Sequence, residues 1–282
     1  MKIKLISDST CDLSKELIEK YDIAIVPLYV MIDDQMRKDG VDMTPEDIYD
    51  YVERKGVLPS TSAGSIGDYI DTFTYWKEQG YDQIVHFSIS SGFSSSYANA
   101  CIAAEEVGDV FVVDSKNLST GQGLVVLYGA DLLAEGKDGK EIAESCSAIT
   151  DKVEASFVVD SIDYLHKGGR CSAVAALGAN LLSLKPCIEV EDGKMKSGKK
   201  YRGKISMVIK NYVKERLADR NDIDSHRIFI THTKCDEQDV QNVRDIIQEV
   251  APYFEEILET TAGGTITTHC GPNTLGVLFV RK

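Results

Sequence analysis

Short apolar runs alternate with amphipathic stretches along the first half of the chain. Residues 2–7 and 84–87 are predicted strand interiors, and 24–32 is apolar at nearly every position, which is typical of a strand with helices on both faces. Thr44 and Pro45 form an N-cap and a first helical position, so a helix is predicted from there to about residue 55. This alternation predicts a parallel sheet between two layers of helices.

Further elements are predicted on the same grounds: helices over 14–20, 66–80, 97–107, 118–133 and 138–153, and a strand over 110–113. The loop at 58–64, LPSTSAG, is predicted to lack regular structure. Three glycines lie within 118–133, and each costs up to about 1 kcal/mol in a helix relative to alanine. Close packing of another element against this helix explains them.

The pattern changes after residue 155, where strands and helices alternate less strictly. The predicted elements are strands over 155–160, 227–231, 254–260 and 275–280, helices over 205–218 and 236–250, and a hairpin over 188–204 turning at Asp192-Gly193. A short helix, a Gly-Gly-Arg turn and a second helix of small residues are predicted between the first strand and the hairpin. We therefore expect a three-layer α/β (Rossmann-like) domain over 1–152 and an α+β domain over 153–282.

Composition narrows the class of protein. The 282 residues are 43% hydrophobic and 27% charged, as in soluble globular proteins, and no apolar run is long enough to span a bilayer. The chain turns polar too early for a secretory signal, so a cytoplasmic location is expected. A net charge of -14 repels nucleic acid and anionic lipid, so no nucleic-acid partner and only transient membrane contact are expected.

The cysteines and histidines follow no metal-binding or disulfide pattern. Seven cysteines occur without a C-x-x-C pair, and five histidines occur without an H-E-x-x-H arrangement. Reduced thiols and no metal site are expected.

A serine-rich turn between the strand at 84–87 and the helix from about Tyr97 is the first candidate for chemistry. Ser94, Ser95 and Ser96 fall where that helix begins. Serines cap helices, and a helix N-terminus also attracts a carboxylate or a phosphate. Capping and anion binding are both open interpretations of this cluster.

Seven motifs together resemble the DegV family. They are SDST at 7–10, STS at 60–62, SSGFSSSY at 90–97, VVDS at 112–115, LHKGGR at 165–170, LKP at 184–186 and HCGPNTLG at 269–276. The resemblance implies a two-domain protein that holds a long-chain fatty acid in a tunnel between its domains. It also implies a carrier without a catalytic residue or cofactor, which presents the lipid to a separate ATP-dependent fatty acid kinase.

Matched by position, the resemblance assigns Thr61 and Ser94 to the carboxylate, with Arg170 and His269 beside the head group. Ser62 and Ser95, in the same two loops, complete the expected ligand-binding set. The glycines before Arg170 let its guanidinium approach an anion, and His269 has a charge that can change near neutral pH.

Three departures from the family pattern occur. Ala63-Gly64 stands where Gln-Pro is common, Cys171 where an aliphatic residue follows Gly-Gly-Arg, and Asn273 where a glycine follows Gly-Pro. The first is nearest the head group, so it bears on loop shape and lipid preference.

Affinity for such a lipid comes mainly from its tail. About 14 buried methylenes contribute roughly 11 kcal/mol before ordering costs. The small-residue stretch 173–182, AVAALGANLL, suits a tunnel wall, and ordinary helix packing explains it as well.

A basic segment lies within the predicted hairpin. Lys194, Lys196, Lys199, Lys200, Arg202 and Lys204 are six basic residues in eleven, leaving 25 basic against 45 acidic residues elsewhere. One interpretation is a docking surface for the kinase, with Arg202 the main candidate; the other is a solvated rim.

Two other functions are considered. Gly92-Phe93-Ser94-Ser95-Ser96 is close to the G-x-S-x-G turn of serine hydrolases, with Asp114 and His269 following in hydrolase order, but its last glycine is missing. Nucleotide binding is disfavoured because GGTITTHCG lacks a P-loop lysine.

Overall fold

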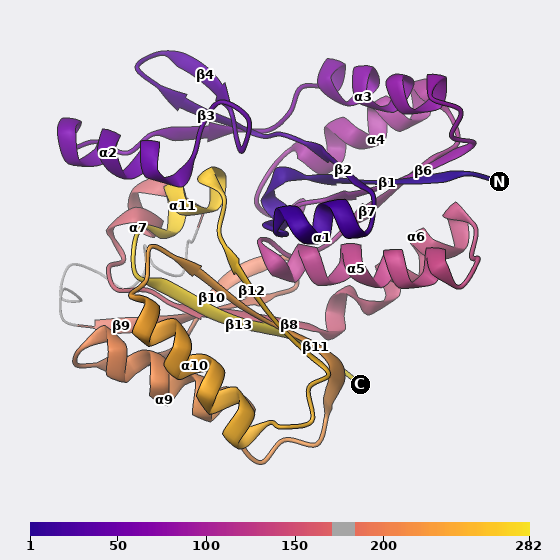
Figure 1. The fold of residues 1–282 in the computed structure, drawn as a ribbon. Helices are drawn as coiled ribbons and strands as arrows, with labels where there is room; N and C mark the ends of the chain where they lie inside the picture. Colours follow the sequence, from indigo (N-terminus) through magenta and orange to yellow (C-terminus); the bar gives the residue numbers. More distant parts are fainter. Residues whose placement is uncertain (171–183) are drawn as a thin grey trace.

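The computed structural model describes residues 1–170 and 184–282 (Figure 1). A four-stranded sheet of order β2-β1-β6-β7 forms in the first half, and every pairing in it is parallel. Its strands are β1 (Ile3–Asp8), β2 (Ile23–Val26), β6 (Gln83–Ser88) and β7 (Val110–Asp114). The predicted parallel sheet is confirmed.

Helices cover both faces of this sheet, because successive side chains of a strand point to opposite sides. Ile6 and Ile84 pack with α3 and α4, whereas Leu5, Val85 and Phe87 pack with α1, α5 and α6. These helices are α1 (Lys15–Lys20), α3 (Ile66–Glu78), α4 (Ser96–Val107), α5 (Thr120–Ala134) and α6 (Gly139–Ile149). Two short 3-10 turns, Ser9–Cys11 and Thr150–Lys152, complete this part.

The second half forms a six-stranded sheet of order β10-β9-β8-β13-β11-β12, in which only β11 and β12 pair in parallel. Its strands are β8 (Val153–Val158), β9 (Leu184–Glu191), β10 (Lys194–Arg202), β11 (Ile223–Thr233), β12 (Glu256–Thr261) and β13 (Thr274–Arg281). Helices α9 (Ile205–Leu217) and α10 (Glu237–Val250) cover one of its faces. The mixed α/β class is thus as predicted, while the domain boundary at 152 stays a prediction.

Helix α5 lies between the two sheets. A Cβ at Gly129 would lie 2.5 Å from the ring of Phe87 in the first sheet, and one at Gly121 would lie 3.2 Å from Ala155 in the second. Close approach on both sides explains the glycines, and it joins the two halves through one buried helix.

A small third sheet, of order β4-β3-β5, corrects two predictions. Residues 24–32 do not form one strand: β2 ends at Val26 in the first sheet, and β3 (Tyr29–Ile32) pairs antiparallel with β4 (Gln35–Lys38) and β5 (Ser60–Ser62). Pro27, which has no N–H to donate, lies at the break. The loop at 58–64 was predicted to be irregular, yet its centre is β5, because backbone pairing with β3 needs no apolar pattern.

Helix α2 (Pro45–Lys55) covers the small sheet, and its predicted cap is confirmed, since Thr44 and Asp47 form a capping box. Two short helices, α7 (Asp163–Gly168) and α11 (Gly264–Cys270), pack against each other beside it. Helix α11 was not predicted. The small-residue stretch 173–182 and Cys171 lie outside the described residues. Over the described ranges, no helix has the length and apolar character needed to cross a membrane.

Candidate ligand-binding site

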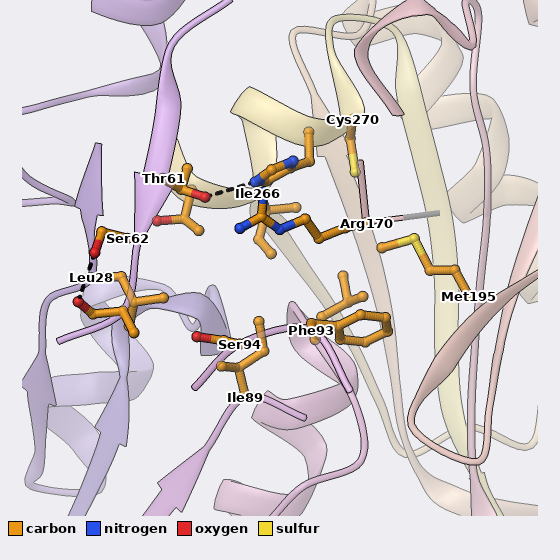
Figure 2. A pocket seen from close by; sticks show the side chains of 14 residues that line it. Leu28, Thr61, Ser62, Ile89, Phe93, Ser94, Arg170, Met195, Ile266 and Cys270 are labelled. Atoms are coloured by element: carbon orange, nitrogen blue, oxygen red, sulfur yellow. Dashed lines mark hydrogen bonds between the residues drawn. The ribbon is translucent and has the colours of Figure 1, made fainter. Parts of the chain in front are cut away.

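A cavity of about 50 Å3 lies where β5, the serine-rich loop before α4, the end of α7 and helix α11 meet (Figure 2). It is lined by Leu28, Thr61, Ser62, Ala63, Ile89, Phe93, Ser94, Leu118, Arg170, Met195, Thr265, Ile266, His269 and Cys270. Segments distant in the sequence therefore build it together. Five of the six predicted ligand-binding residues are among them, and Ser95 is not.

A second cavity of about 30 Å3 adjoins the first, and Leu118, Ile266 and Cys270 line both. Its other walls come mainly from the six-stranded sheet, including Phe157 and Leu278. The hydroxyls along it already have protein partners: Ser119 with Asp12, Thr231 with Thr120, Thr233 with the carbonyl of Gly271, and Thr274 with the carbonyl of Cys270. The second cavity therefore offers mostly apolar surface to a guest.

Thr61 and His269 form the polar pair of the first cavity. Thr61 Oγ1 lies 2.8 Å from His269 Nε2, although 208 residues separate them in the chain. Thr61 lies opposite Val30 in the small sheet, so both side chains point to the same face, and Ser62 points to the other. The Ser62 hydroxyl is exposed and donates to the carbonyl of Ala63.

The imidazole of His269 is largely buried, and burial together with nearby Arg170 lowers its pKa to about 4. His269 is consequently neutral at neutral pH. Its charge was expected to be able to change near neutral pH, but a pKa of about 4 moves that change to acidic pH. A Cβ at Gly168 would lie 2.3 Å from His269 Nδ1. Gly168 thus makes room for the histidine, and Gly169, with φ at 67°, ends α7 in the left-handed conformation.

Ser94 both caps α4 and faces the cavity. Its Oγ accepts a hydrogen bond from the Ser96 backbone N–H (3.2 Å) and lies 2.9 Å from the buried Ser96 hydroxyl. Ser95 is exposed and makes no capping bond. The two interpretations of the serine cluster, capping and a group available to a ligand, meet at Ser94.

Arg170 is exposed at the mouth of the cavity, and Figure 2 shows its guanidinium extending toward Thr61. One of its terminal nitrogens donates to the carbonyl of Gly168 at 3.0 Å. The guanidinium keeps further N–H groups for an anion at the mouth.

Two acidic side chains from the first half of the chain hold the beginning of α11, which no pattern in the sequence indicated. Asp12 accepts a hydrogen bond from the Gly263 N–H (2.9 Å), and Asp39 accepts from the N–H groups of Gly264 (2.7 Å) and Thr265 (3.0 Å). Burial raises the pKa of Asp12 to about 8. Both acidic residues looked like ordinary loop residues in the sequence, yet they fix the helix that carries His269.

The turn of the β9–β10 hairpin closes over the serine-rich loop, a contact that the sequence also did not reveal. The Ser90 hydroxyl donates to the Gly193 carbonyl at 2.8 Å, and a Cβ at Gly92 would lie 2.3 Å from that same oxygen. The hairpin itself is as predicted, with Asp192 and Gly193 both at positive φ.

The basic segment of this hairpin is partly neutralised. Lys196 pairs with Glu191 at 2.7 Å and Lys199 pairs with Glu215 at 2.7 Å. Arg202 is exposed, and over residues 1–170 and 184–282 it has no ion pair. The positive surface is thus smaller than the sequence count suggested, with Arg202 still part of it.

A hydrolase triad is not assembled. Asp114 hydrogen bonds with Ser91 and with the Lys116 backbone N–H, not with His269. His269 contacts Thr61, and Ser94 contacts Ser96. Within the described part of the chain, no group of three or more His, Cys, Asp or Glu side chains is placed to hold a metal ion.

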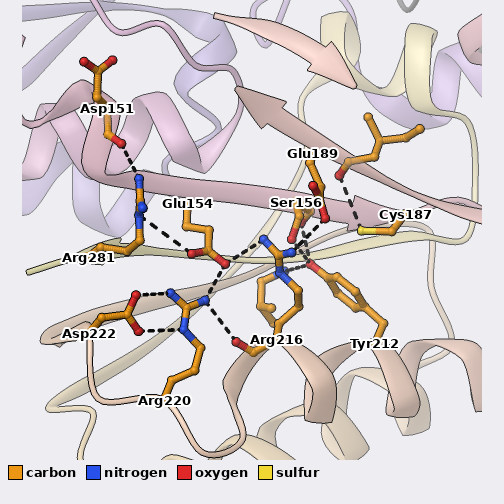
Figure 3. A network of polar contacts seen from close by, with 12 residues as sticks. Asp151, Glu154, Ser156, Cys187, Glu189, Tyr212, Arg216, Arg220, Asp222 and Arg281 are labelled. Carbon is orange, nitrogen blue, oxygen red and sulfur yellow. Dashed lines mark hydrogen bonds and ion pairs between the residues drawn. The ribbon is translucent and has the colours of Figure 1, made fainter. Parts of the chain in front are cut away.

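A separate polar network joins β8, β9 and α9 away from the cavity (Figure 3). Glu154 accepts hydrogen bonds from Arg216 and Arg220, each at 2.7 Å, and Arg216 also pairs with Glu189. Each arginine of this network is paired with a carboxylate, so the network ties β8 and β9 to α9.

Comparison with known proteins identifies the family of this chain. The sequence model of the DegV family matches residues 2–282. This chain belongs to the DegV family. A DegV domain-containing protein of Clostridium perfringens is 30% identical over 290 residues, which cover 100% of this chain and 99% of that protein.

Solved structures of DegV proteins share the fold. A DegV family protein from Thermus thermophilus, described as binding fatty acid, has a TM-score of 0.88 at 28% identity, with 100% of both chains covered. A stearic acid-binding protein from Eubacterium ventriosum has a TM-score of 0.82 at 30% identity, with 100% of this chain and 99% of that chain covered. The resemblance seen in the sequence is confirmed at the level of family and fold.

One departure from the DegV pattern has a simple structural account. Asn273 has φ at 57°, in the left-handed region that glycine favours and that asparagine tolerates better than most residues. Ala63 lines the cavity, and the carbonyl of Gly64 accepts from Asn99 at 2.8 Å.

Proposed function

We propose that this protein binds a long-chain fatty acid, with the carboxylate in the first cavity and the tail extending into the second. The observation that carries the proposal is that the Thr61–His269 pair and Ser94 line the same cavity, and that this cavity adjoins a second, mostly apolar one. Relatives with the same fold that are described as fatty-acid-binding support it.

The hydrogen-bond pattern can accommodate an acceptor as the guest. If neutral His269 donates from Nε2 to Thr61, the Thr61 hydroxyl keeps its own proton for the ligand. Ser96 can likewise donate to Ser94 from both its N–H and its hydroxyl, which leaves the Ser94 proton available. A carboxylate only accepts hydrogen bonds, so it matches two such donors.

The tail needs more room than the two cavities of about 50 and 30 Å3 provide, since ligand pockets usually measure about 300 Å3 or more. Binding must therefore widen the path at the shared walls. About 14 buried methylenes, worth roughly 11 kcal/mol, are enough to offset a moderate rearrangement.

In this proposal the protein is a carrier and not an enzyme. Arg170, exposed at the mouth, faces the reacting end of the lipid, where a separate ATP-dependent kinase would form an acyl phosphate. Arg202 is the proposed contact with that kinase. Ser62 and Ser95 are expected to contribute less than Thr61 and Ser94, because their exposed hydroxyls can hydrogen bond to water.

The test of binding combines identification with mutation. An organic extract of the purified protein is expected to contain a long-chain fatty acid, which mass spectrometry would identify. Thr61→Val and Ser94→Ala should each weaken palmitic acid binding by about tenfold, since each removes a bond to a charged group. Ser62→Ala, on the same strand but with its side chain on the opposite face, is the matched control and should weaken binding by less than about twofold, because its exposed hydroxyl already donates to the carbonyl of Ala63. An extract without lipid, together with no measurable palmitic acid binding, would refute the proposal.

The kinase partnership has its own test. Arg202→Glu should abolish acyl-phosphate formation by an added fatty acid kinase while palmitic acid binding stays unchanged. Lys196→Glu reverses a charge on the same hairpin that is already paired, and should have a smaller effect. Equal activity of the Arg202 variant and the wild type would exclude docking through this residue.

A further inference from the structure

Thr265 is a buried threonine in the wall of the first cavity. It lies in α11, is 4% exposed, and lines the first cavity with Thr61 and His269. Its Oγ1 is buried and has no hydrogen-bond partner among the described residues. Its neighbours differ, because the Thr267 hydroxyl donates to the carbonyl of Ala262 and the Thr268 hydroxyl donates to that of Gly264.

The position of Thr265 is fixed from two directions. Its backbone N–H donates to Asp39 at 3.0 Å, so the beginning of α11 is anchored to the small-sheet side of the molecule. His269 follows four residues later, and residues four apart lie on the same face of a helix. The free hydroxyl therefore stands one turn before the imidazole that holds Thr61.

A buried hydroxyl without a partner is unfavourable, and such groups in native proteins call for an explanation. The backbone N–H groups at this end of α11 are not partners for the Thr265 hydroxyl, because they already donate to Asp12 and Asp39. An oxygen atom of a ligand in the cavity would be such a partner.

We propose that Thr265 is a third hydroxyl donor to the carboxylate of the bound fatty acid, which rests on the function proposed above. A carboxylate has two oxygens with about four lone-pair sites, and Thr61 and Ser94 supply only one proton each. A third donor favours the ionised head group and lowers the pKa of the bound acid. Thr265 thereby selects for a free, ionised acid over an uncharged ester or alcohol.

The test uses two threonines of the same helix. Thr265→Val removes the unpaired hydroxyl, and Thr268→Val removes one that is bonded inside the protein at similar burial. Thr265→Val should weaken palmitic acid binding about five- to tenfold without lowering the melting temperature of the lipid-free protein. Thr268→Val should lower the melting temperature and leave the affinity within about twofold.

A second measurement reads the head group directly. The carboxyl of [1-13C]palmitic acid, followed by NMR over pH in the complex, should titrate at higher pH in Thr265→Val than in the wild type. Thr265→Ser keeps the hydroxyl and should keep the wild-type affinity and titration, which separates hydrogen bonding from loss of packing.

Three results would overturn the proposal. The first is wild-type affinity and titration in Thr265→Val. The second is a Thr265→Ser protein as weak as Thr265→Val, because methyl packing would then be the cause. The third is a wild type that binds no palmitic acid, which would remove the proposed function as well and is thereby distinguished from the other two.

Discussion

Helices α11 and α4 both begin at the cavity, but their N-terminal N–H groups have different kinds of partner. At α11 the first backbone N–H groups donate to Asp12 and Asp39, two acidic side chains of the protein itself. At α4 the first backbone N–H group donates to a neutral residue, Ser94, whose hydroxyl also lines the cavity. A helix N-terminus is thus not an anion site by position alone. The first N–H groups of α11 are bonded to acidic side chains that fix the helix carrying His269, whereas α4 presents a serine hydroxyl to the cavity.

The largest expected effect comes from weakening the hydrogen bonds between Asp39 and the N-terminus of α11. Asp39→Asn sets an amide NH2 against one of two backbone N–H groups, so we expect the free energy of unfolding to fall by about 3 kcal/mol. Urea denaturation measures this change. Asp34→Asn, in the exposed β3–β4 turn, is the control and should leave it unaltered. Unchanged stability in Asp39→Asn would show that α11 is not held through this carboxylate.

The pH dependence of stability tests whether the imidazole of His269 is buried away from water. The pKa of His269 is lowered to about 4, so the unfolded chain takes up a proton near pH 6.5 before the folded protein does. Stability from this group is complete above pH 6.5 and is lost as pH falls toward 4, by about 2 kcal/mol at pH 5.

The comparison with His269→Gln isolates that contribution. Asp12, whose pKa is raised to about 8, has the opposite sign and adds stability as pH falls from 8 to 4. Asp12 is present in both proteins, so the difference between their urea stabilities at each pH reports His269. A difference that does not change between pH 8 and pH 5 would show that the imidazole is hydrated.

The serine-rich loop before α4 is held by the hairpin turn, and this contact is expected to matter less. Gly92→Ala places a methyl group against the Gly193 carbonyl, which should cost about 1 to 2 kcal/mol and speed the release of a fluorescent fatty acid. Gly108→Ala is unsuitable as a control because its φ is positive; Gly67→Ala, which has room for a Cβ, is suitable. Release at the wild-type rate would show that the turn does not restrain the serine loop.

The smallest effect separates the serines of the cluster. Ser95→Ala removes an exposed hydroxyl that makes no capping bond, so stability should change by less than about 0.5 kcal/mol and lipid affinity by less than about twofold. Calorimetric titration with palmitic acid checks this against Ser94→Ala. An equal loss in both variants would mean that the whole cluster contacts the ligand.

Local signals in the sequence were sufficient wherever neighbouring residues decide the structure. The α2 cap at Thr44, the Asp192-Gly193 turn and strands β1, β6 and β7 depend on contacts within a few residues or on side-chain period, so they were predictable. Motifs in order along the chain were also enough to indicate the DegV family and the loops of the cavity.

Tertiary structure decided what depends on distant partners. The division of residues 24–32 at Pro27 follows from pairing with two different sheets, and the strand at Ser60–Ser62 exists because β3 lies beside it. Pairing also places the Thr61 side chain, and not that of Ser62, on the face of β5 that meets His269, since adjacent strand residues alternate. Asp12 and Asp39 hold α11, and Thr265 lines the cavity, only because α11 folds against residues more than 200 positions earlier, a contact that no local pattern encodes.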